Sequence, residues 1–383
     1  MLGRDRELTA QSRQASVGRN RTSASNPKVG FDAHVLDGRF QGSRTVIIRL
    51  AQALARDHAD IDVTLYCESR PDPCPRIRHG SLPVAGAMRR LALDLPRIAC
   101  RDDLDALIYQ YICAPWSRNS WVVIHDVLPI THARLFRAVF VVRSAILFML
   151  SMIWARRVVV VSQYTADSVL RIAPFVRKKL TVVLNGPSFD EDLYFQEYPA
   201  PARPPYILAV GRLERRKNID LLVRAFSRAG PQGVELIVVG KAEPGYSPPL
   251  GAPGVIYIES VQEAALAALY ANAALFVYPS AAEGFGLPLL DAVLFGVPTL
   301  SSNRTAMPEV GGDLPEYFDP ETPDAEAVLA RRISEHFGGR PVKAPSQAAR
   351  LGHAKAFSWT KSAESLANAI RAQPLRVRAG PLS

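Results

Sequence analysis

Two acidic residues and the glycines between them are the part of this sequence best suited to chemistry. Glu283 stands directly before a Gly-Phe-Gly turn, and Leu287-Pro288 then opens an apolar helix that carries Asp291. Glycine lets the backbone approach a ligand closely, and the amide groups at a helix start attract an anion. The segment therefore predicts an anion-binding cradle with a carboxylate on either side. A sugar joined to a nucleoside diphosphate has matching parts, because its hydroxyl groups flank two phosphates.

A second group of polar residues follows an apolar run, Tyr206–Val210, which we expect to form a strand. Arg212 and Lys217 lie in the turn after this run, and Asn218 is a suitable N-cap for the amphipathic helix pattern that follows. Cations at a strand-to-helix turn can converge on a phosphate group. The two basic residues are therefore candidate phosphate ligands, with pairing to Glu214 and other surface acids as the alternative.

The order of these motifs resembles that of the family 4 glycosyltransferases, which are retaining enzymes of the GT-B fold. The family signature E-G-F-G-x-P-x-x-E is followed by G-x-P and by P-E-x-x-G, and this chain has matching segments at 283–291, 296–298 and 308–312. The resemblance implies an α/β protein with two Rossmann-like, doubly wound domains that face a cleft.

The resemblance also implies roles for the residues of the signature. In the family the first acid meets the donor sugar and the second holds the ribose hydroxyls, which implies these roles for Glu283 and Asp291. Phe285, Gly286 and Leu287 are the further donor-binding residues that the segment predicts. Position 291 departs from the family pattern, because it holds Asp where Glu is usual and its carboxylate is one methylene shorter.

Arg212 and Lys217 match the diphosphate ligands of the family pattern G-R-x-x-x-x-K-N. Both are expected to contribute to catalysis, because the leaving diphosphate gains charge in the transition state. Arg215 and Arg216 have no counterpart in that pattern, and we expect them to face solvent.

In the first half of the chain, an expected strand runs into His125 and Asp126, which resemble the H-D-x-x-P turn of the family. The resemblance implies that His125 lies beside the donor sugar and stabilises oxocarbenium character, without acting as a general base; a purely structural histidine is the alternative. Asp126 is expected to orient His125 or to cap the following turn. Gly42 and Ser43 loosely match a glycine-rich loop of the family and are candidates for donor or acceptor contact, with an ordinary turn as the alternative.

Short apolar runs alternate with longer helical patterns along most of the chain, which predicts two domains of parallel α/β units. The expected strands are 29–31, 63–66, 106–109, 121–124, 158–161, 181–184, 206–210, 235–239, 255–258, 275–278 and 299–301. The expected division is a disordered tail (1–27), an acceptor-side Rossmann-like domain (28–198), a proline-rich linker (199–205), a nucleotide-sugar Rossmann-like domain (206–357), a helix packing back on the first domain (358–373) and a tail (374–383).

The composition restricts the classes of protein and partner. With 383 residues and 48% hydrophobic content, the chain is long enough for two domains with buried cores. Its net charge of +10 indicates an anionic partner, and nucleotide sugars, anionic lipid and nucleic acid all qualify on charge alone. The four cysteines lack zinc-site spacing and no N-terminal stretch resembles a secretory signal, which favours a cytoplasmic protein without a metal site.

Residues 134–157 form an unusual stretch with five arginines and no acid. On a helical wheel Arg137, Ser144 and Ser151 share one side, and the remaining arc is largely apolar. The apolar run is too short to span a bilayer. Two interpretations stay open: a core helix of the first domain, or a helix that also touches an anionic membrane, with arginines at the headgroups and Trp154 at the interface.

These features predict a retaining, metal-independent hexosyltransferase that uses a nucleotide sugar and needs no cofactor and no nucleic acid partner. GDP-mannose is the first choice of donor, because the turn at His125 and the Gly240-Lys241 pair resemble mannosyltransferases. The expected acceptor is a saccharide or lipid-linked saccharide of cell-surface polysaccharide synthesis. The alternatives are another GT-B nucleotide-sugar enzyme, such as an epimerase or phosphorylase, and a non-catalytic nucleotide-sugar binder.

Overall fold

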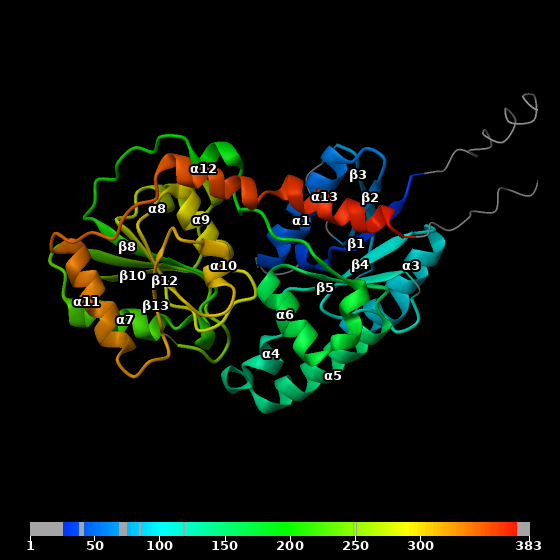
Figure 1. Cartoon of the computed structure of the whole chain (residues 1–383), viewed down its shortest axis with the longest axis horizontal. Helices are drawn as coiled ribbons and strands as arrows, with labels where there is room; N and C mark the ends of the chain where they lie inside the picture. Colours follow the sequence, from blue (N-terminus) through cyan, green and yellow to red (C-terminus); the bar gives the residue numbers. More distant parts are fainter. Residues whose placement is uncertain are drawn as a thin grey trace, which may run out of the picture.

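The computed structural model describes residues 26–37, 42–68, 75–83, 86–117, 119–247, 249 and 251–373. Most of the two predicted tails, and residues 38–41 of the loop before Gly42, lie outside these ranges. The described chain forms two α/β domains that lie side by side (Figure 1). Each domain is built around one parallel sheet, which confirms the predicted fold class.

The first domain contains a parallel sheet of seven strands in the order β3-β2-β1-β4-β5-β6-β7. Every residue of β4 and β5, at its centre, is buried. A parallel sheet that helices cover on both faces requires such near-continuous apolar strands. The strands are β1 (Lys28–Asp32), β2 (Asp62–Cys67), β3 (Ile77–Ser81), β4 (Ala106–Gln110), β5 (Ser120–Ile124), β6 (Arg157–Val160) and β7 (Leu180–Val182).

The second domain contains a parallel sheet of six strands in the order β10-β9-β8-β11-β12-β13. In each sheet the strand order reverses once, between β1 and β4 in the first and between β8 and β11 in the second. At such a switch point the connections leave on opposite sides and open a crevice at the carboxyl ends of the strands. The strands are β8 (Tyr206–Val210), β9 (Glu235–Val239), β10 (Val255–Ile258), β11 (Leu275–Tyr278), β12 (Thr299–Ser302) and β13 (Glu316–Phe318).

Helices pack on both sheets, and two of their starts matter for the site. α9 begins at Leu287 with a proline in its first turn, as predicted. Asn218 takes the N-cap position of α7, but its φ is 56° and its side chain makes no cap hydrogen bond. The helices are α1 (Gly42–Asp57), α2 (Ala87–Arg89), α3 (Leu95–Arg101), α4 (Leu128–Thr131), α5 (Ala138–Trp154), α6 (Gln163–Ile172), α7 (Ile219–Ala229), α8 (Glu263–Ala271), α9 (Leu287–Phe295), α10 (Met307–Gly311), α11 (Ala325–Phe337), α12 (Gln347–Ala356) and α13 (Trp359–Arg371).

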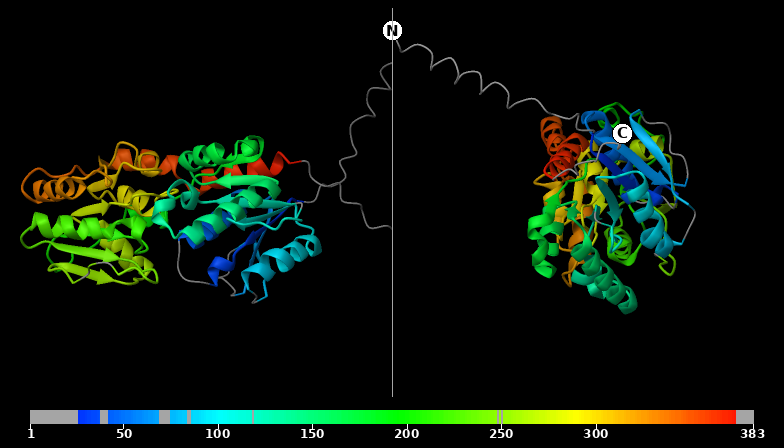
Figure 2. Two further views of the ribbon diagram at one scale, coloured as in Figure 1. Left: turned by 90° about the horizontal axis from the view of Figure 1, so that it is seen from below. Right: turned by 90° about the vertical axis from the view of Figure 1, so that its right-hand side faces the viewer.

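The last helix, α13, returns from the second domain and packs against α1 of the first (Figures 1 and 2). Its first residue, Trp359, donates a hydrogen bond from Nε1 to Pro187 O at 2.8 Å. A Cβ at Gly186 would lie 2.7 Å from the Trp359 ring, so only glycine fits beneath the indole. The helix therefore ties the end of the chain to the segment that leaves β7.

The segment that leaves β7 packs against the second domain well before the proline-rich stretch at 199–205. The ring of Phe189 lies edge-on to Phe295 with centroids 5.3 Å apart, and Tyr194 lies 4.6 Å from the same ring. Phe295 in turn stacks on Tyr270 of α8 at 5.4 Å. This aromatic cluster fixes the path of the chain between the domains against α8 and α9.

Helix α5 is a surface helix whose two serines face inward. Its buried residues are Ser144, Phe148, Ser151 and Met152, and Ser151 Oγ accepts a hydrogen bond from Cys113 N at 3.2 Å. Its apolar arc faces outward instead, which differs from a simple core helix. Among the described residues, no helix is long and apolar enough to cross a membrane.

Candidate active site

The predicted site residues lie in loops that follow strands of the two sheets. Lys217 follows β8 and Glu283 follows β11, which are the two strands at the switch point of the second sheet. His125 follows β5, and Gly42 begins the helix after β1. Parallel strands place all these loops at the carboxyl edge of their sheet, so the predicted residues come from the two edges that face each other.

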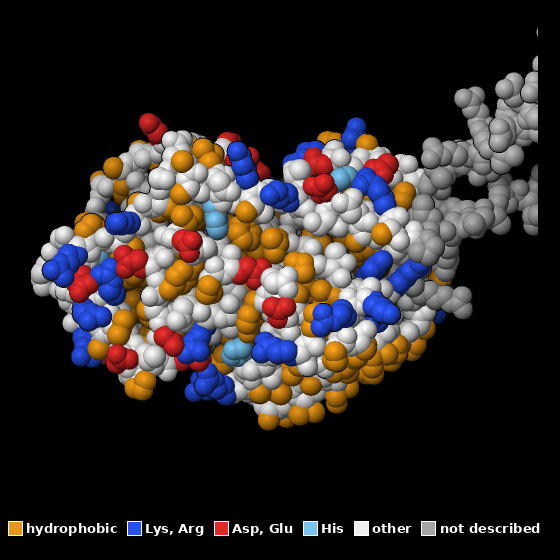
Figure 3. Space-filling view, viewed as in Figure 1, with side chains coloured by type: hydrophobic (Ala, Val, Ile, Leu, Met, Phe, Trp, Pro, Cys, Tyr) orange, Lys and Arg blue, Asp and Glu red, His pale blue; other side chains and the backbone are white. Residues whose placement is uncertain are grey.

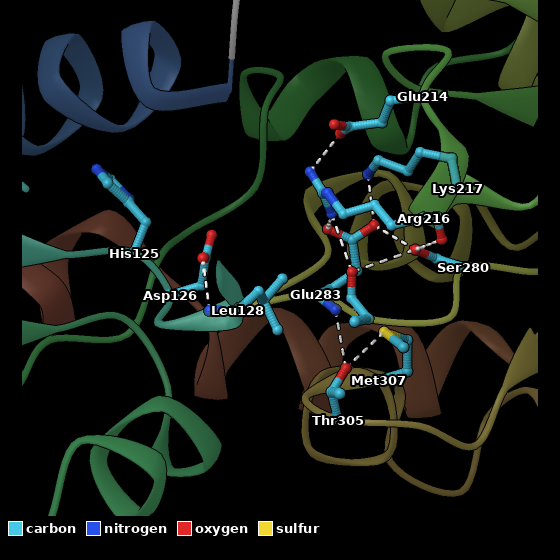
Figure 4. Close-up of polar contacts among 12 residues, drawn as sticks. His125, Asp126, Leu128, Glu214, Arg216, Lys217, Ser280, Glu283, Thr305 and Met307 are labelled. Atoms are coloured by element: carbon cyan, nitrogen blue, oxygen red, sulfur yellow. Dashed lines mark hydrogen bonds and ion pairs between the residues drawn. The ribbon is translucent and has the colours of Figure 1, made fainter. Parts of the chain in front are cut away.

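Side chains that donate hydrogen bonds enclose the carboxylate of Glu283 (Figure 4). Its Oε1 accepts from Lys217 Nζ at 2.5 Å, from Ser280 Oγ at 2.7 Å and from Tyr278 Oη at 2.9 Å. Its Oε2 accepts from Arg216 Nη1 at 2.6 Å. Four donors therefore hold the carboxylate of this buried residue in one orientation.

The charges of this cluster keep Glu283 ionised. Burial alone would raise the pKa of Glu283, but Arg216 and Lys217 outweigh burial and lower it to about 2. Burial lowers the pKa of Lys217, and the charge of Glu283 opposes that shift. Burial also acts against the charge of Arg216, but Glu283 and Glu214 raise its pKa above the ordinary value. At neutral pH the site contains a buried carboxylate with two cations in direct contact.

The prediction that Arg216 faces solvent is wrong. Its Nη1 also donates to Ala282 O at 2.9 Å, and its Nη2 lies 2.6 Å from Glu214 Oε1. The three residues Arg215–Lys217 form a 3₁₀ turn, in which successive side chains are about 120° apart. Arg215 therefore points to solvent, as predicted, while the next side chain turns inward.

Arg212 lies at the rim of the site rather than in the Glu283 cluster. Its side chain is 41% exposed and forms an ion pair with Glu243 at 2.6 Å. The sequence left open whether Arg212 and Lys217 pair with surface acids. Arg212 does so, whereas Lys217 pairs with the buried Glu283. Lys217, Gly211 and Tyr278 line a small hollow at the ends of β8 and β11.

His125 is a half-buried, neutral histidine. Its Nε2 donates a hydrogen bond to Gln110 Oε1 at 2.6 Å, and its ring lies 5.2 Å from that of Tyr111. Burial lowers the pKa of His125 to about 4, so the imidazole carries no charge at neutral pH. Asp126 caps the following turn, because its Oδ1 accepts from Leu128 N at 3.1 Å. In Figure 4 the ring of His125 points away from Glu283.

The two domains are in direct contact at Gly284, the first glycine of the signature. A Cβ at this position would lie 2.0 Å from His125 O, so any side chain would force the domains apart. The Gly284 carbonyl accepts hydrogen bonds from Ser162 Oγ at 2.6 Å and Thr165 Oγ1 at 3.1 Å, both in the first domain. The glycine therefore sets how closely the Glu283 loop approaches the His125 turn.

Glu309 makes a second contact between the domains. Its carboxylate accepts from Gln163 N at 2.7 Å and from Tyr164 N at 2.8 Å, which are the first two amides of α6. An acid at a helix start satisfies amides that have no partner within the helix. Glu309 thus has a structural contact here.

The starts of α1 and α9 face each other across the domain boundary. A Cβ at Gly42 would lie 3.6 Å from Leu287 Cδ1, within van der Waals distance. Ser43 follows in the first turn of α1 and is half-buried. Gly286, with a φ of 105°, forms the N-cap of α9. By contrast, Phe285 is buried against Phe357, with ring centroids 5.9 Å apart, and contributes packing.

Asp291 lies on the inner side of α9 and binds the segment between the domains. Its Oδ1 accepts from Tyr194 Oη at 2.6 Å and from Ser188 N at 2.9 Å. Burial raises the pKa of Asp291 to about 6, because these partners are neutral and only partly offset the loss of water. Asp291, the second acid of the signature, is only 3% exposed.

Sequence reasoning missed four side chains that shape the site: Arg216, Tyr278, Ser280 and Gln110. Tyr278 and Ser280 precede Glu283 by five and three residues, so a turn after β11 folds their hydroxyls back onto its carboxylate. Gln110 ends β4, the neighbour of the strand that carries His125. The sequence offered a signal for Tyr278 and for Gln110, because each is a polar residue at the end of an apolar run.

Two doubly wound domains whose strand ends face each other define the GT-B fold, and solved structures agree with this fold class. Sucrose-phosphate synthase from Thermosynechococcus elongatus superposes with a TM-score of 0.71 at 18% identity, over 90% of this chain and 98% of that one. WaaG, described as a glycosyltransferase involved in lipopolysaccharide biosynthesis, gives 0.68 at 15% identity, over 90% and 100%.

Two family matches cover most of the described chain. Residues 204–335 match the family described as glycosyl transferases group 1, and residues 40–191 match glycosyltransferase family 4. The chain therefore contains a glycosyltransferase family 4 domain followed by a glycosyl transferases group 1 domain.

Curated relatives of the chain include mannosyltransferases. The serotype-specific mannosyltransferase WbdA of Escherichia coli is 30% identical over 234 residues, which are 58% of this chain and 28% of that protein. The O-antigen chain mannosyltransferase B of Escherichia coli is 30% identical over 246 residues, 57% of this chain and 61% of that protein. The matched segments span less than two thirds of the length of these relatives.

Proposed function

We propose that this protein transfers a hexose from a nucleotide sugar to an acceptor hydroxyl with retention of anomeric configuration. The observation that carries the proposal is the ionised carboxylate of Glu283, held by Lys217 and Arg216 beside the contact with the His125 turn. A ligand without phosphate or other negative charge would not require Lys217, Arg216 and the start of α9 in the same place.

The donor diphosphate binds at the turn after β8 and at the start of α9 in this proposal. Lys217 lies at the hollow beside Gly211, and Arg212 is free enough at the rim to leave Glu243 for a phosphate. Arg216 bonds to the other carboxylate oxygen of Glu283 and keeps this carboxylate in place. Cations fixed before the reaction stabilise the charge that develops on the leaving diphosphate.

The sugar lies between Glu283 and His125 in this proposal. The bond from the anomeric carbon to the phosphate oxygen breaks, and its electron pair leaves with the diphosphate. The acceptor oxygen forms its bond on the same face, and its proton passes to the departing phosphate oxygen. His125 is neutral and therefore serves to position the sugar hydroxyls, while the negative charge of Glu283 stabilises the oxocarbenium character.

We propose mannose, carried by GDP, as the first donor to test, and a saccharide or lipid-linked saccharide as the acceptor. The support is the similarity to two mannosyltransferases of Escherichia coli, one of which is described as acting on the O-antigen chain. Asp291, or the segment it binds at Ser188, is the proposed contact for the ribose.

We propose that the reaction needs no metal ion, because Arg212 and Lys217 supply the positive charge. In the part of the chain that the structure describes, no group of three or more His, Cys, Asp or Glu side chains is placed to hold a metal. Equal turnover in EDTA and in magnesium is the expected result, and a loss of turnover in EDTA would contradict it.

The first test is a thermal-shift titration with GDP, UDP and ADP in EDTA. A ligand at one hundred times its dissociation constant stabilises a protein by about 2.7 kcal/mol, which is a readable shift. We expect a shift with GDP that is lost in Lys217→Ala and kept in Arg215→Ala, whose side chain points to solvent. A shift with UDP alone would change the donor class, and no shift with any nucleotide would contradict the site.

The second test separates transfer from other reactions of a nucleotide sugar. Incubation with GDP-mannose should release GDP only when a saccharide acceptor is present, and the product should show the donor's anomeric configuration by NMR. Epimerised donor or a sugar phosphate as product would favour the other GT-B enzyme classes. Tight binding without any turnover would favour a nucleotide-sugar binder.

A further inference from the structure

The outer face of α5 is an apolar surface that nothing in the described chain covers. Its side chains include Val139 at 82% exposed, Val142 at 59% and Ile146 at 55%. The face continues with Phe140, Ile153 and Trp154, which are each between 39% and 50% exposed. Figure 3 shows a continuous run of hydrophobic side chains along the lower edge of the first domain, where Figure 1 places α4 and α5.

The orientation of α5 is the reverse of an ordinary surface helix in water. Such a helix turns its polar residues to solvent and its apolar stripe to the core. Here Ser144 and Ser151 are buried, and Val142 and Ile146 face out. A contiguous exposed apolar face of this kind marks an interaction site.

The charge around this face selects the kind of partner. Residues 134–157 contain five arginines and no acid. Four of them, Arg137, Arg143, Arg156 and Arg157, form no ion pair with any residue that the structure describes, whereas Arg134 pairs with Glu321. Lys179 adds a cation at the last turn of α5, where its Nζ donates to Ile153 O at 2.9 Å. An apolar face rimmed by cations is complementary to an anionic lipid surface.

We propose that the outer face of α5 binds an anionic membrane, with the helix lying along the interface. The helix has 17 residues and is about 26 Å long at 1.5 Å per residue. Arg137 and Arg156 lie at its two ends, and Arg143 lies within it, beside the apolar arc. Arg143 shows this arrangement, since its guanidinium lies 5.7 Å from the ring of Phe140 on the same helix. Trp154, near the carboxyl end, presents the ring type that favours the headgroup level.

The inner face of α5 contacts the candidate active site. Phe148, on this face, stacks on Tyr111 with ring centroids 5.5 Å apart, and Tyr111 lies 5.2 Å from His125. The turn that begins at His125 leads through α4 directly into α5. On the basis of the proposed function, the acceptor side of the cleft lies two aromatic rings, Tyr111 and Phe148, away from the membrane. A lipid-linked saccharide would be held there.

The test is vesicle sedimentation of the full chain, with vesicles of phosphatidylcholine alone and of phosphatidylcholine mixed with phosphatidylglycerol, which gives the second set an anionic surface. We expect binding to the anionic vesicles, with at least a tenfold loss in Val142→Glu and in Ile146→Glu. Leu351→Glu, at an exposed apolar residue of α12 in the other domain, is the matched control and should bind as the parent does.

The arginines provide an independent arm of the test. Arg137→Gln and Arg143→Gln should each weaken binding to anionic vesicles by about fivefold, and added salt should weaken binding further. Equal binding to both vesicle types, or no effect of either glutamate variant, would overturn the proposal. Self-association that Val142→Glu abolishes, without vesicle binding, would assign the face to a contact between copies of the chain. Thermal shifts with nucleotides are measured on the same variants, so failure of membrane binding and failure of the proposed function are distinguishable.

Discussion

The two acids of the E-G-F-G signature lie eight residues apart in one segment, yet the structure gives them opposite surroundings. Glu283 meets two cations and two hydroxyls, which lower its pKa to about 2. Asp291 meets one hydroxyl and one backbone amide, and burial raises its pKa to about 6. Both are almost fully buried, so burial alone does not explain the difference.

The comparison shows that a charged partner, and not the degree of burial, decides whether a buried acid stays ionised. The cations beside Glu283 come from the turn after β8, the neighbouring strand of β11. The partners of Asp291, Ser188 N and Tyr194 Oη, are neutral groups of the segment between the domains. One acid is thus built into an electrostatic cluster, and the other joins α9 to the path of the chain.

The largest effect is expected from Glu283→Gln. Removing the carboxylate leaves the buried Lys217 without its counterion and Arg216 with Glu214 alone, which should lower the free energy of unfolding by about 3–5 kcal/mol. Urea unfolding at pH 7 measures this loss. Glu243→Gln is the control, because its pair with Arg212 is exposed and should contribute less than about 1 kcal/mol. Equal losses in the two variants would remove the contrast on which the comparison rests.

The next effect concerns turnover. Lys217→Ala and Arg212→Ala should each reduce kcat by about 10²–10³, the scale of losing one preorganised donor to a developing charge. Arg215→Ala, in the same turn but exposed, should leave kcat unchanged. Parental rates in both of the first two variants would contradict the assignment of the diphosphate site.

A smaller effect, with a defined sign, is expected from Asp291→Asn. The pKa of Asp291 is higher in the folded protein than its ordinary value of 3.8, so the folded protein binds a proton more readily between about pH 4 and 6. The contribution of this group to stability therefore falls as the pH rises through that window. Relative to the parent, the variant should gain about 2–3 kcal/mol in free energy of unfolding from pH 4 to pH 7. Parallel pH profiles for variant and parent would contradict the raised pKa.

Glu283 should show the opposite slope in the same titration. Its pKa is lowered from 4.5 to about 2, so its contribution to stability is complete above about pH 4.5 and is lost as the pH falls toward 2. Glu283→Gln should therefore lose part of its disadvantage against the parent at low pH. Unfolding curves of both variants across pH 3–7 sharpen the comparison in a single experiment.

The smallest effect is expected from Tyr194→Phe, which removes the hydroxyl bonded to Asp291. The loss should be about 1–2 kcal/mol in free energy of unfolding, because the hydroxyl donates to Asp291 and also accepts from Phe189 N. Tyr198→Phe is the control, because its hydroxyl bonds only to Leu193 O nearby. If Tyr194→Phe were no more costly than the control, the tie between α9 and the segment between the domains would be less important than we infer.

The central strands of both sheets were predictable from sequence because they are buried on both faces and read as apolar runs. β3 and β13 were not predicted, and both lie at the edge of a sheet. β3 has the sequence IRHGS with no buried residue, and β13 has three residues. Neither strand contains a run of apolar residues, whereas the edge strands β7 and β10 do and were predicted.

The side chains of the site divide in the same way. Glu283, Lys217 and His125 were found from motif and spacing, and the structure places them on facing loops. Arg216 was assigned to solvent, because the direction of a side chain in a three-residue 3₁₀ turn depends on the turn's conformation and not on residue type. The orientation of α5 was left open for a similar reason, since its serine side and its apolar side were both visible in the sequence.

The sequence by itself determined that the chain forms two doubly wound domains and carries a glycine-rich helix start with two acids, because local pattern and glycine, proline and charged residues act over short distances. The tertiary structure decided which acid meets cations and which meets neutral groups. It also decided that α5 turns its serines inward and its apolar face outward. These outcomes depend on contacts between segments far apart in the chain, such as Arg216 with Glu283 and Tyr194 with Asp291.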